Sequence, residues 1–476
     1  MKRRDFLKDL GLLSAGAAFG GMEFSANAME ESSIFPAMPA ALKGAKPLDG
    51  LGRNIRSLAP QIGDKVVTCV IVGAGNRGIA YSKYALKYPK NIRVVGVSDI
   101  KEFRRKRMGE MFNIPEEARF GDFHEILSKP KMADAMLICL PDGLHYEACM
   151  KALELGYDVL LEKPMAQTEK ECKNLLAQSK KYNRIVATCH VLRYAPYFIA
   201  LREAVQSGMI GKVISMQHLE PIEYDHMAHS YVRGNWYDSK ATTPIILAKS
   251  CHDLDIMRWI IDKPCTDVSA EGDLTYFTAA NAPAGAPARC TDGCPHEATC
   301  PYSAIRIYAK MRRRLQVFDL KTNTEEEILE KLRTTNYGRC VFHSDNDQPD
   351  HYIANFKFGD VTASFSMEAF TPWGGRRTRI MGTEGYIEGD MQSFTLWKFI
   401  DEKPLVWKAS DVEELPEYKG AGHGGGDFGL ARDFFEAVAL RDPSRLTSTI
   451  DVSVESHVMG FKCEESRLKG RKVKMK

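Results

Sequence analysis

Residues 66–78 read VVTCVIVGAGNRG, and this stretch decides the fold class of the chain. A continuous apolar run of this kind predicts a strand that is buried on both faces. The strand leads directly into a G-x-G-x-x-G turn formed by Gly73, Gly75 and Gly78. In such a turn the first glycine allows the tight bend, the second lets a pyrophosphate approach the backbone, and the third lets the next helix pack on the strand.

The residues after the turn favour dinucleotide binding. The predicted helix starts with Asn76 and Arg77, and its N-terminus offers free N–H groups and a positive dipole end to phosphates. The next predicted strand ends at Asp99, where this fold binds a ribose diol. A carboxylate there favours NAD over NADP because it repels a 2′-phosphate, although the nearby basic residues Lys101 and Arg104 leave NADP open.

Two kinds of strand pattern predict two domains. Strands and helices alternate over residues 65–189, which predicts an α/β Rossmann domain with a doubly wound parallel sheet. Beyond residue 189 the strands alternate apolar and polar residues, which is typical of an open, mainly antiparallel sheet. Residues 190–476 are therefore expected to form an α+β substrate and oligomerisation domain, with the substrate bound between the domains.

The N-terminal residues have the features of an export signal. Arg3 and Arg4 precede a short apolar, glycine-rich stretch, and residues 26–28 form a small-residue cleavage pattern. We expect a twin-arginine signal over residues 1–28, which would direct the protein to the periplasm. Residues 29–64 contain prolines and glycines with little periodicity, and are expected to form an exposed arm or linker.

The composition is that of a globular protein with mixed surface charges. Its hydrophobic content is 44%, its charged content is 27%, and its net charge is +3. This balance favours neither a nucleic-acid partner nor, after signal cleavage, a membrane. An open sheet commonly pairs with a second copy, so we expect a homodimer or homotetramer.

Several motifs together resemble the Gfo/Idh/MocA family, named after glucose–fructose oxidoreductase, inositol dehydrogenase and a rhizopine-catabolism protein. The matching stretches are the glycine turn, Leu140-Pro141 with His145, GYDVLLEKP at residues 156–164, RYAP at residues 193–196, HDLD at residues 252–255 with Arg258 and Trp259, and GTEG at residues 382–385. The resemblance implies a Rossmann domain followed by an open-sheet domain, a nicotinamide cofactor, and a sugar or cyclitol substrate.

The resemblance also implies the residues that perform the chemistry. Lys163 is expected to contact the reacting hydroxyl, and His252 to act as general acid or base. Many relatives carry an aspartate four residues before this histidine, where this chain has Ala248. The next residue, Lys249, is then a candidate substitute for the missing acid, or a charge that only lines the cleft.

The resemblance adds further candidates for the cofactor site. Those expected to flank the nicotinamide half of the nucleotide are Leu140, Pro141, His145, Glu162 and Arg193. A Gly-rich segment, residues 422–426, precedes Asp427, which is either a helix cap or, with His423, a contact to sugar hydroxyls.

Three cysteines lie apart from the others. Cys290, Cys294 and Cys300 occur within eleven residues of a Pro/Gly-rich stretch that also contains His296. They predict a structural zinc site, one disulfide with a free thiol, or three plain thiols.

Taken together, these observations predict an exported NAD(P)-dependent oxidoreductase that transfers a hydride between a sugar or cyclitol carbon and a tightly bound nicotinamide. Because free NAD is scarce outside the cytoplasm, an alternative is an NAD-dependent glycosidase that works through a transient 3-keto sugar and elimination. A third alternative is a sugar-binding relative without catalytic activity.

Overall fold

The computed structural model describes residues 45–411, 415–418 and 422–476. The predicted signal at residues 1–28 and part of the predicted arm, residues 29–44, lie outside the described residues. The described residues all belong to one unit, residues 41–476.

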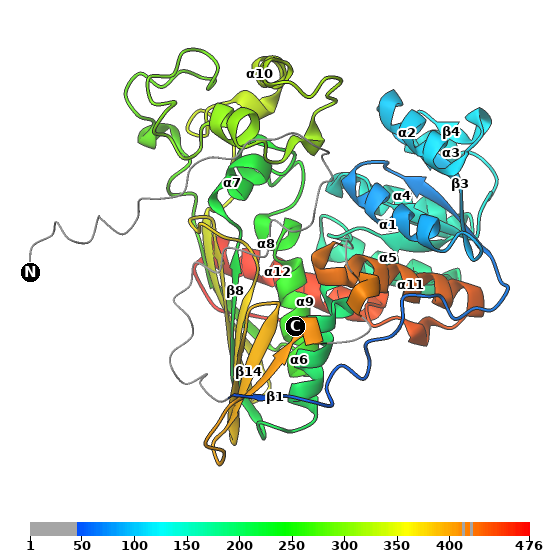
Figure 1. Ribbon diagram of the computed structural model, residues 1–476, viewed down its shortest axis with the longest axis vertical. Coiled ribbons are helices and arrows are strands. Elements are labelled where there is room, and N and C mark those ends of the chain that lie inside the picture. Colours follow the sequence, from blue (N-terminus) through cyan, green and yellow to red (C-terminus); the bar gives the residue numbers. More distant parts are fainter. Residues whose placement is uncertain (1–44, 412–414, 419–421) are drawn as a thin grey trace, which may run out of the picture. The chain divides into compact units, whose positions relative to one another are not determined.

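The first half of the chain forms the predicted parallel sheet (Figure 1). Its six strands, in spatial order, are β4 (Arg119–Phe120), β3 (Ile92–Ser98), β2 (Val67–Val72), β5 (Ala135–Ile138), β6 (Asp158–Leu161) and β7 (Val186–Thr188). The helices between them are α1 (Asn76–Lys87), α2 (Glu102–Phe112), α3 (Phe123–Leu127), α4 (His145–Glu154) and α5 (Glu169–Lys181). The α/β prediction is confirmed.

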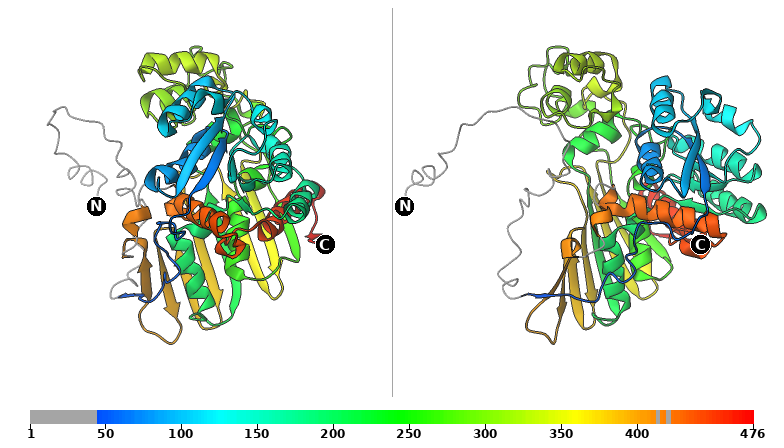
Figure 2. Two further views of the ribbon diagram at one scale, coloured as in Figure 1. Left: turned by 90° about the vertical axis from the view of Figure 1, so that its right-hand side faces the viewer. Right: turned by 45° about the vertical axis from the view of Figure 1, so that its right-hand side comes forward.

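Both faces of this sheet are covered, which is why its strands are apolar throughout. Side chains at alternate positions of β2 belong to two separate cores. One core includes α1, α2 and the C-terminal helix α11 (Gly426–Leu440), and the other includes α3, α4, α5 and the last helix α12 (Ile450–Lys469). In both views of Figure 2 the orange and red C-terminal helices lie against the blue and cyan sheet. The end of the chain therefore completes the first domain.

The second sheet is mixed and mainly antiparallel, as predicted. Its ten strands, in spatial order, are β1 (Lys46–Pro47), β15 (Leu405–Lys408), β14 (Ser393–Lys398), β13 (Gly385–Gly389), β12 (Arg377–Gly382), β8 (Val213–Pro221), β11 (Val361–Glu368), β10 (His351–Phe358), β9 (Asp267–Glu271) and β16 (Val473–Lys474). Only two of its pairings, β1 with β15 and β8 with β11, are parallel. Helices α6 (Pro196–Gln206) and α9 (Cys251–Ile261) share its core (Figure 1).

Short elements fill the connections of the second domain. Between β8 and α9 the chain forms α7 (Tyr224–His226), the π-helix η6 (Met227–Arg233) and α8 (Ile245–Ala248). The long connection from β9 to β10 contains the π-helix η8 (Ile305–Lys310) and α10 (Glu325–Thr334), and is otherwise mostly irregular. It carries the three cysteines noted in the sequence.

Residues 45–64 are bound to the rest of the protein. β1 adds to the edge of the second sheet, and the side chains of Leu48, Ile55 and Leu58 are buried. The Glu203 carboxylate accepts hydrogen bonds from the backbone N–H groups of residues 52–54. Buried apolar side chains therefore anchor this part of the expected arm, although many of its other residues are exposed as expected.

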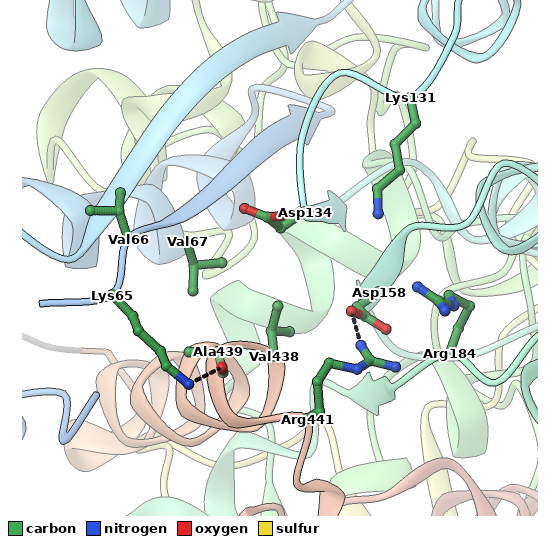
Figure 3. Close-up of a pocket in the computed structure, with 10 residues that line it drawn as sticks. All are labelled: Lys65, Val66, Val67, Lys131, Asp134, Asp158, Arg184, Val438, Ala439 and Arg441. Carbon is green, nitrogen blue, oxygen red and sulfur yellow. Dashed lines mark hydrogen bonds and ion pairs between the residues drawn. The ribbon is translucent and has the colours of Figure 1, made fainter. Parts of the chain in front are cut away.

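A cavity of about 360 Å³ lies at the edge of the first sheet where β2 and β6 begin (Figure 3). Lys65, Lys131, Arg184 and Arg441 line it together with Asp134 and Asp158, and Arg441 pairs with Asp158. Doubly wound sheets bind their ligands at the opposite edge, beyond the carboxyl ends of the strands. This cavity is therefore not the cofactor site.

No helix in the described part of the chain is long and apolar enough to cross a membrane.

We predict that Leu58→Ala lowers the free energy of unfolding by about 2–5 kcal/mol, because it removes a fully buried side chain from the core. Urea denaturation followed by circular dichroism measures this change. The exposed neighbour Arg53, replaced in Arg53→Ala, is the control and should shift stability by less than about 0.5 kcal/mol. Equal stability of both variants would show that residues 45–64 are not anchored as described.

Candidate functional site

The glycine turn joins β2 to α1 in a conformation that two of its glycines require. Gly73 has a φ of +94°, and a Cβ atom on it would lie 2.3 Å from the carbonyl oxygen of Cys139. A Cβ atom on Gly78 would lie 2.2 Å from the carbonyl oxygen of Gly73. Gly75 differs, since a Cβ atom there would have its nearest neighbour, an Arg104 nitrogen, at 3.5 Å. Close packing within the protein thus explains why residues 73 and 78 are glycines. At Gly75 the protein leaves room for a side chain, and an approaching ligand would explain the glycine there.

The N-terminus of α1 is free to bind an anion. Its N-cap is Gly75, which has no side chain to cap the helix, and the first turn contains no acidic residue. Asn76 and Arg77 are the first two residues of this helix. Uncapped N–H groups at a glycine turn are the usual binding site for a pyrophosphate.

Asp99 follows the last residue of β3, beside the turn. Its carboxylate accepts hydrogen bonds of 2.8 Å from the N–H groups of Ala74 and Lys101. Arg104 lies 3.6 Å away. The acid, the turn and the helix N-terminus therefore meet at one edge of the sheet, as the sequence predicts.

Arg77 is engaged by two buried carboxylates. Its Nε lies 2.7 Å from Glu162, and its two terminal nitrogens donate hydrogen bonds of 3.0 and 2.8 Å to Asp427. Burial raises the pKa of Glu162, but Arg77 and then Lys163 outweigh it, so that the pKa lies below its ordinary value. Arg77 and Glu162 thus connect the turn to α11, a role that the sequence does not reveal.

The loop after β5 is held by His145. One ring nitrogen of His145 lies 2.7 Å from the carbonyl oxygen of Pro164, and the other lies 2.8 Å from that of Leu140. Leu140 is half-buried and Pro141 is exposed beside it. His145 therefore ties the Leu140 loop to the segment that contains Lys163.

Lys163 lies between the two domains, just beyond the end of β6. Its peptide bond to Pro164 is cis, and its Nζ donates a hydrogen bond of 2.6 Å to the carbonyl oxygen of Ala248. Ala248 ends α8 in the second domain, directly before Lys249. Lys163 therefore meets the second domain at the residue before Lys249, through a backbone carbonyl oxygen.

His252 lies in the first turn of α9 and is 5% exposed. Its ring lies 6.2 Å from that of His190 and 5.7 Å from that of His423, between ring centroids. Burial, with Lys163 next in effect, lowers the pKa of His252 well below its ordinary value. The imidazole is therefore neutral at neutral pH, and its Nδ1 has no hydrogen-bond partner among the described residues.

Arg193 is buried and paired with a carboxylate. Two of its nitrogens contact the Asp255 carboxylate at 2.6 and 2.7 Å, and the third donates to the carbonyl oxygen of Thr447. Asp255 lies on α9, so this ion pair positions the helix that carries His252. The structure thus assigns Arg193 an ion pair within the protein, and its predicted cofactor contact stays a prediction.

Lys249 belongs to a buried charge cluster that sequence reasoning missed. Its Nζ lies 3.0 Å from Glu220 on β8, and Arg376 lies 2.5 Å from the second oxygen of that carboxylate. Arg376 also contacts Asp253 at 2.8 Å, and Asp253 lies 3.0 Å from His218. These residues come from three separate parts of the chain, and no spacing in the sequence relates them.

The cysteine cluster lies in the connection from β9 to β10. Cys290, Cys294, Cys300 and His296 line one small cavity together with Cys340, which the sequence did not single out. All 12 cysteines are free thiols, so the predicted disulfide is not formed. Among the described residues no group of three or more acidic, cysteine or histidine side chains is arranged to hold a metal ion, so the zinc prediction is not supported.

Two family models match consecutive parts of the chain. The model described as "Oxidoreductase family, NAD-binding Rossmann fold" matches residues 67–190, and that of the "GFO/IDH/MocA C-terminal domain" matches residues 198–388. The chain is 26% identical over 361 residues to a Bacillus subtilis protein named "Putative oxidoreductase YteT". The aligned residues cover 72% of this chain and 80% of YteT. It is 26% identical over 206 residues to the myo-inositol 2-dehydrogenase of Thermotoga maritima, covering 43% of this chain and 58% of that protein.

Solved structures agree on the fold. A levoglucosan dehydrogenase in complex with NADH has a TM-score of 0.64 at 16% identity, covering 87% of this chain and 100% of its own. An inositol dehydrogenase homologue from Azotobacter vinelandii, complexed with NADH and myo-inositol, has a TM-score of 0.62 at 15% identity, covering 88% of this chain and 100% of its own. With both domains matched by family models, the chain belongs to the Gfo/Idh/MocA family of NAD-binding oxidoreductases.

Proposed function

We propose that this protein oxidises a CH–OH group of a sugar or cyclitol and transfers the hydride to a bound NAD. The observation that carries the proposal is the contact of Lys163, from the first domain, with Ala248 in the second, four residues before the buried His252, whose pKa Lys163 helps to lower. Hydride transfer from an alcohol needs groups that bind and orient the reacting hydroxyl beside the nicotinamide. An ammonium and a neutral imidazole with an open ring nitrogen supply such groups.

The residues at the end of the first sheet fit the cofactor. The pyrophosphate would be held by the uncapped N-terminus of α1, where Gly75 leaves its backbone open. The Asp99 carboxylate would accept the hydroxyls of a ribose, which favours NAD over NADP. NAD, when bound, supplies the hydride acceptor, and the chain's own residues only position the substrate and move the proton.

Lys163 and His252 have separate tasks in this proposal. The Lys163 ammonium donates a hydrogen bond to the substrate oxygen, and the His252 Nδ1 accepts one from the hydroxyl proton. The second task needs a neutral imidazole, and the lowered pKa of His252 keeps the ring neutral at physiological pH. The substrate class is proposed from the relatives, several of which are named as inositol dehydrogenases.

We also propose that the chain is exported through the twin-arginine route that the first residues suggest. This route carries folded proteins, so the cofactor can be bound before export. Outside the cytoplasm the enzyme would keep its NAD and reoxidise it on a second substrate. A fusion of residues 1–28 to a reporter, with Arg3 and Arg4 replaced by lysines as the control, tests the signal.

We predict that Gly75→Ala lowers the affinity for NAD at least about 10-fold while leaving the melting temperature unchanged, because the added methyl group fits the free protein and blocks the pyrophosphate. Gly78→Ala is the matched variant and should lower both, since its methyl group would collide with the backbone of Gly73. Isothermal titration calorimetry and thermal unfolding measure the two quantities. Unchanged NAD affinity in Gly75→Ala would contradict the proposed cofactor position.

We predict that Lys163→Met and His252→Phe each lower kcat/KM for polyol oxidation by about 10²- to 10⁴-fold, because each removes a group that binds the reacting hydroxyl. NAD affinity should change little in both variants. Reduced activity with equally reduced NAD affinity would instead indicate a structural role for these residues.

The decisive screen uses the purified protein with inositols, free sugars and aryl glycosides. Formation of NADH, or reoxidation of bound NADH by a second sugar, supports the proposal. Release of the aryl group without net NADH formation would replace it with the transient-oxidation glycosidase. Sugar binding with neither reaction would indicate a binding protein.

A further inference from the structure

The proposed oxidation leaves a proton without an acceptor. The hydroxyl proton must go to a group that can hold it near neutral pH, and efficient acid–base groups have a pKa close to the working pH. Burial and the neighbouring Lys163 keep His252 neutral, so it can accept a hydrogen bond but holds a proton poorly. The acceptor is therefore to be sought among the groups next to His252.

The buried charge cluster around Lys249 adjoins these groups along the chain. Lys249 follows Ala248, whose carbonyl oxygen binds Lys163, and precedes His252 by three residues. Its side chain is 17% exposed, whereas that of its partner Glu220 is 2% exposed. Lys249 is thus the member of the pair that reaches outward, and Glu220 is sealed behind it at 3.0 Å.

The cluster contains two carboxylates in opposite environments. Asp253 is held by Arg376 and His218, and although burial raises its pKa, these partners lower it well below its ordinary value. Burial raises the pKa of Glu220 to about 7, against the effect of Arg376 and with the help of the nearby Asp253. Paired acids whose environments separate their pKa values are typical of acid–base sites.

We propose that Glu220 is the proton acceptor of the oxidation, acting through the Nζ of Lys249. Lys249 passes one of its ammonium protons to the Glu220 carboxylate, which becomes a carboxylic acid and later releases the proton to solvent. As the substrate O–H and C–H bonds break and the carbonyl forms, the Lys249 amine takes up the hydroxyl proton and the hydride goes to the nicotinamide, so Lys249 ends as an ammonium again. Glu220 does not touch the substrate and is a positioning residue for Lys249. This inference rests on the proposed function.

Four titratable or charged side chains from the elements packed around Glu220 act on it. They are Lys249 before α9, Asp253 on α9, Arg376 before β12 and Tyr231 on η6. Lys249 and Arg376 lower the pKa of Glu220, whereas burial and Asp253 raise it. Removing the Lys249 charge must therefore raise the pKa of Glu220 further.

The first test uses the full chain without cofactor or substrate. Infrared difference spectra between about pH 5 and about pH 9 detect a buried carboxylic acid that ionises in this range. We expect one such band with a midpoint near pH 7, absent in Glu220→Gln and moved to higher pH in Lys249→Met. A wild-type protein without this band, or one whose band persists in Glu220→Gln, overturns the proposal even if the enzyme oxidises polyols.

The second test follows activity. In wild type, kcat/KM for oxidation should rise with pH through about 7, because Glu220 must be ionised to accept the proton. In Glu220→Gln, kcat/KM should no longer rise with pH and kcat should fall by about 10²-fold, while the affinity for NAD stays unchanged. In Glu220→Asp, kcat/KM should still rise with pH. Glu388→Gln, which alters an exposed ion pair on the same sheet, is the matched control and should match wild type. A Glu220→Gln profile identical to wild type overturns the proposal.

The two tests distinguish failure of the proposed polyol oxidation from failure of the proposed proton transfer through Lys249 to Glu220. If no polyol is oxidised but the infrared band behaves as expected, the proposed function fails and the Lys249–Glu220 proton pair stands. If polyols are oxidised and the band is missing, the function stands and the pair does not carry the proton.

Discussion

Arg77 joins three segments that are far apart in the chain. It extends from the first turn of α1, its guanidinium contacts Glu162 beside Lys163, and it binds Asp427 at the start of α11. A buried carboxylate without its cation is costly, on the order of 3–5 kcal/mol, so these three segments hold one another in place. The glycine turn, the lysine and the C-terminal helices therefore keep one arrangement.

The same interaction reaches the second domain through His423. Its Nδ1 lies 3.0 Å from Asp427, and its ring lies 5.7 Å from that of His252. On the other side of His252, the Arg193–Asp255 pair positions α9. Because α11 and α12 pack on the first sheet, the end of the chain sets how that sheet faces the residues of the second domain. Lys163 and His252 are thus positioned by buried ion pairs on either side.

The segment around Lys249 connects the two domains to a buried charge cluster. The backbone carbonyl of Ala248 contacts Lys163 of the first domain. The next residue, Lys249, turns its side chain to Glu220 on β8. Two consecutive residues thus join the first domain and a buried carboxylate of the second sheet.

The sequence by itself determined the first domain and its glycine turn, because strand burial, turn chemistry and helix capping are local properties. It also indicated Lys163 and His252, since the motifs around them are continuous stretches. Only the tertiary structure decided that Arg193 and Arg77 are engaged in ion pairs, that Cys340 joins the other cysteines and that Glu220 faces Lys249. These contacts join residues 29 or more positions apart. Their meeting depends on how two sheets and the last helices pack, which no short sequence pattern encodes.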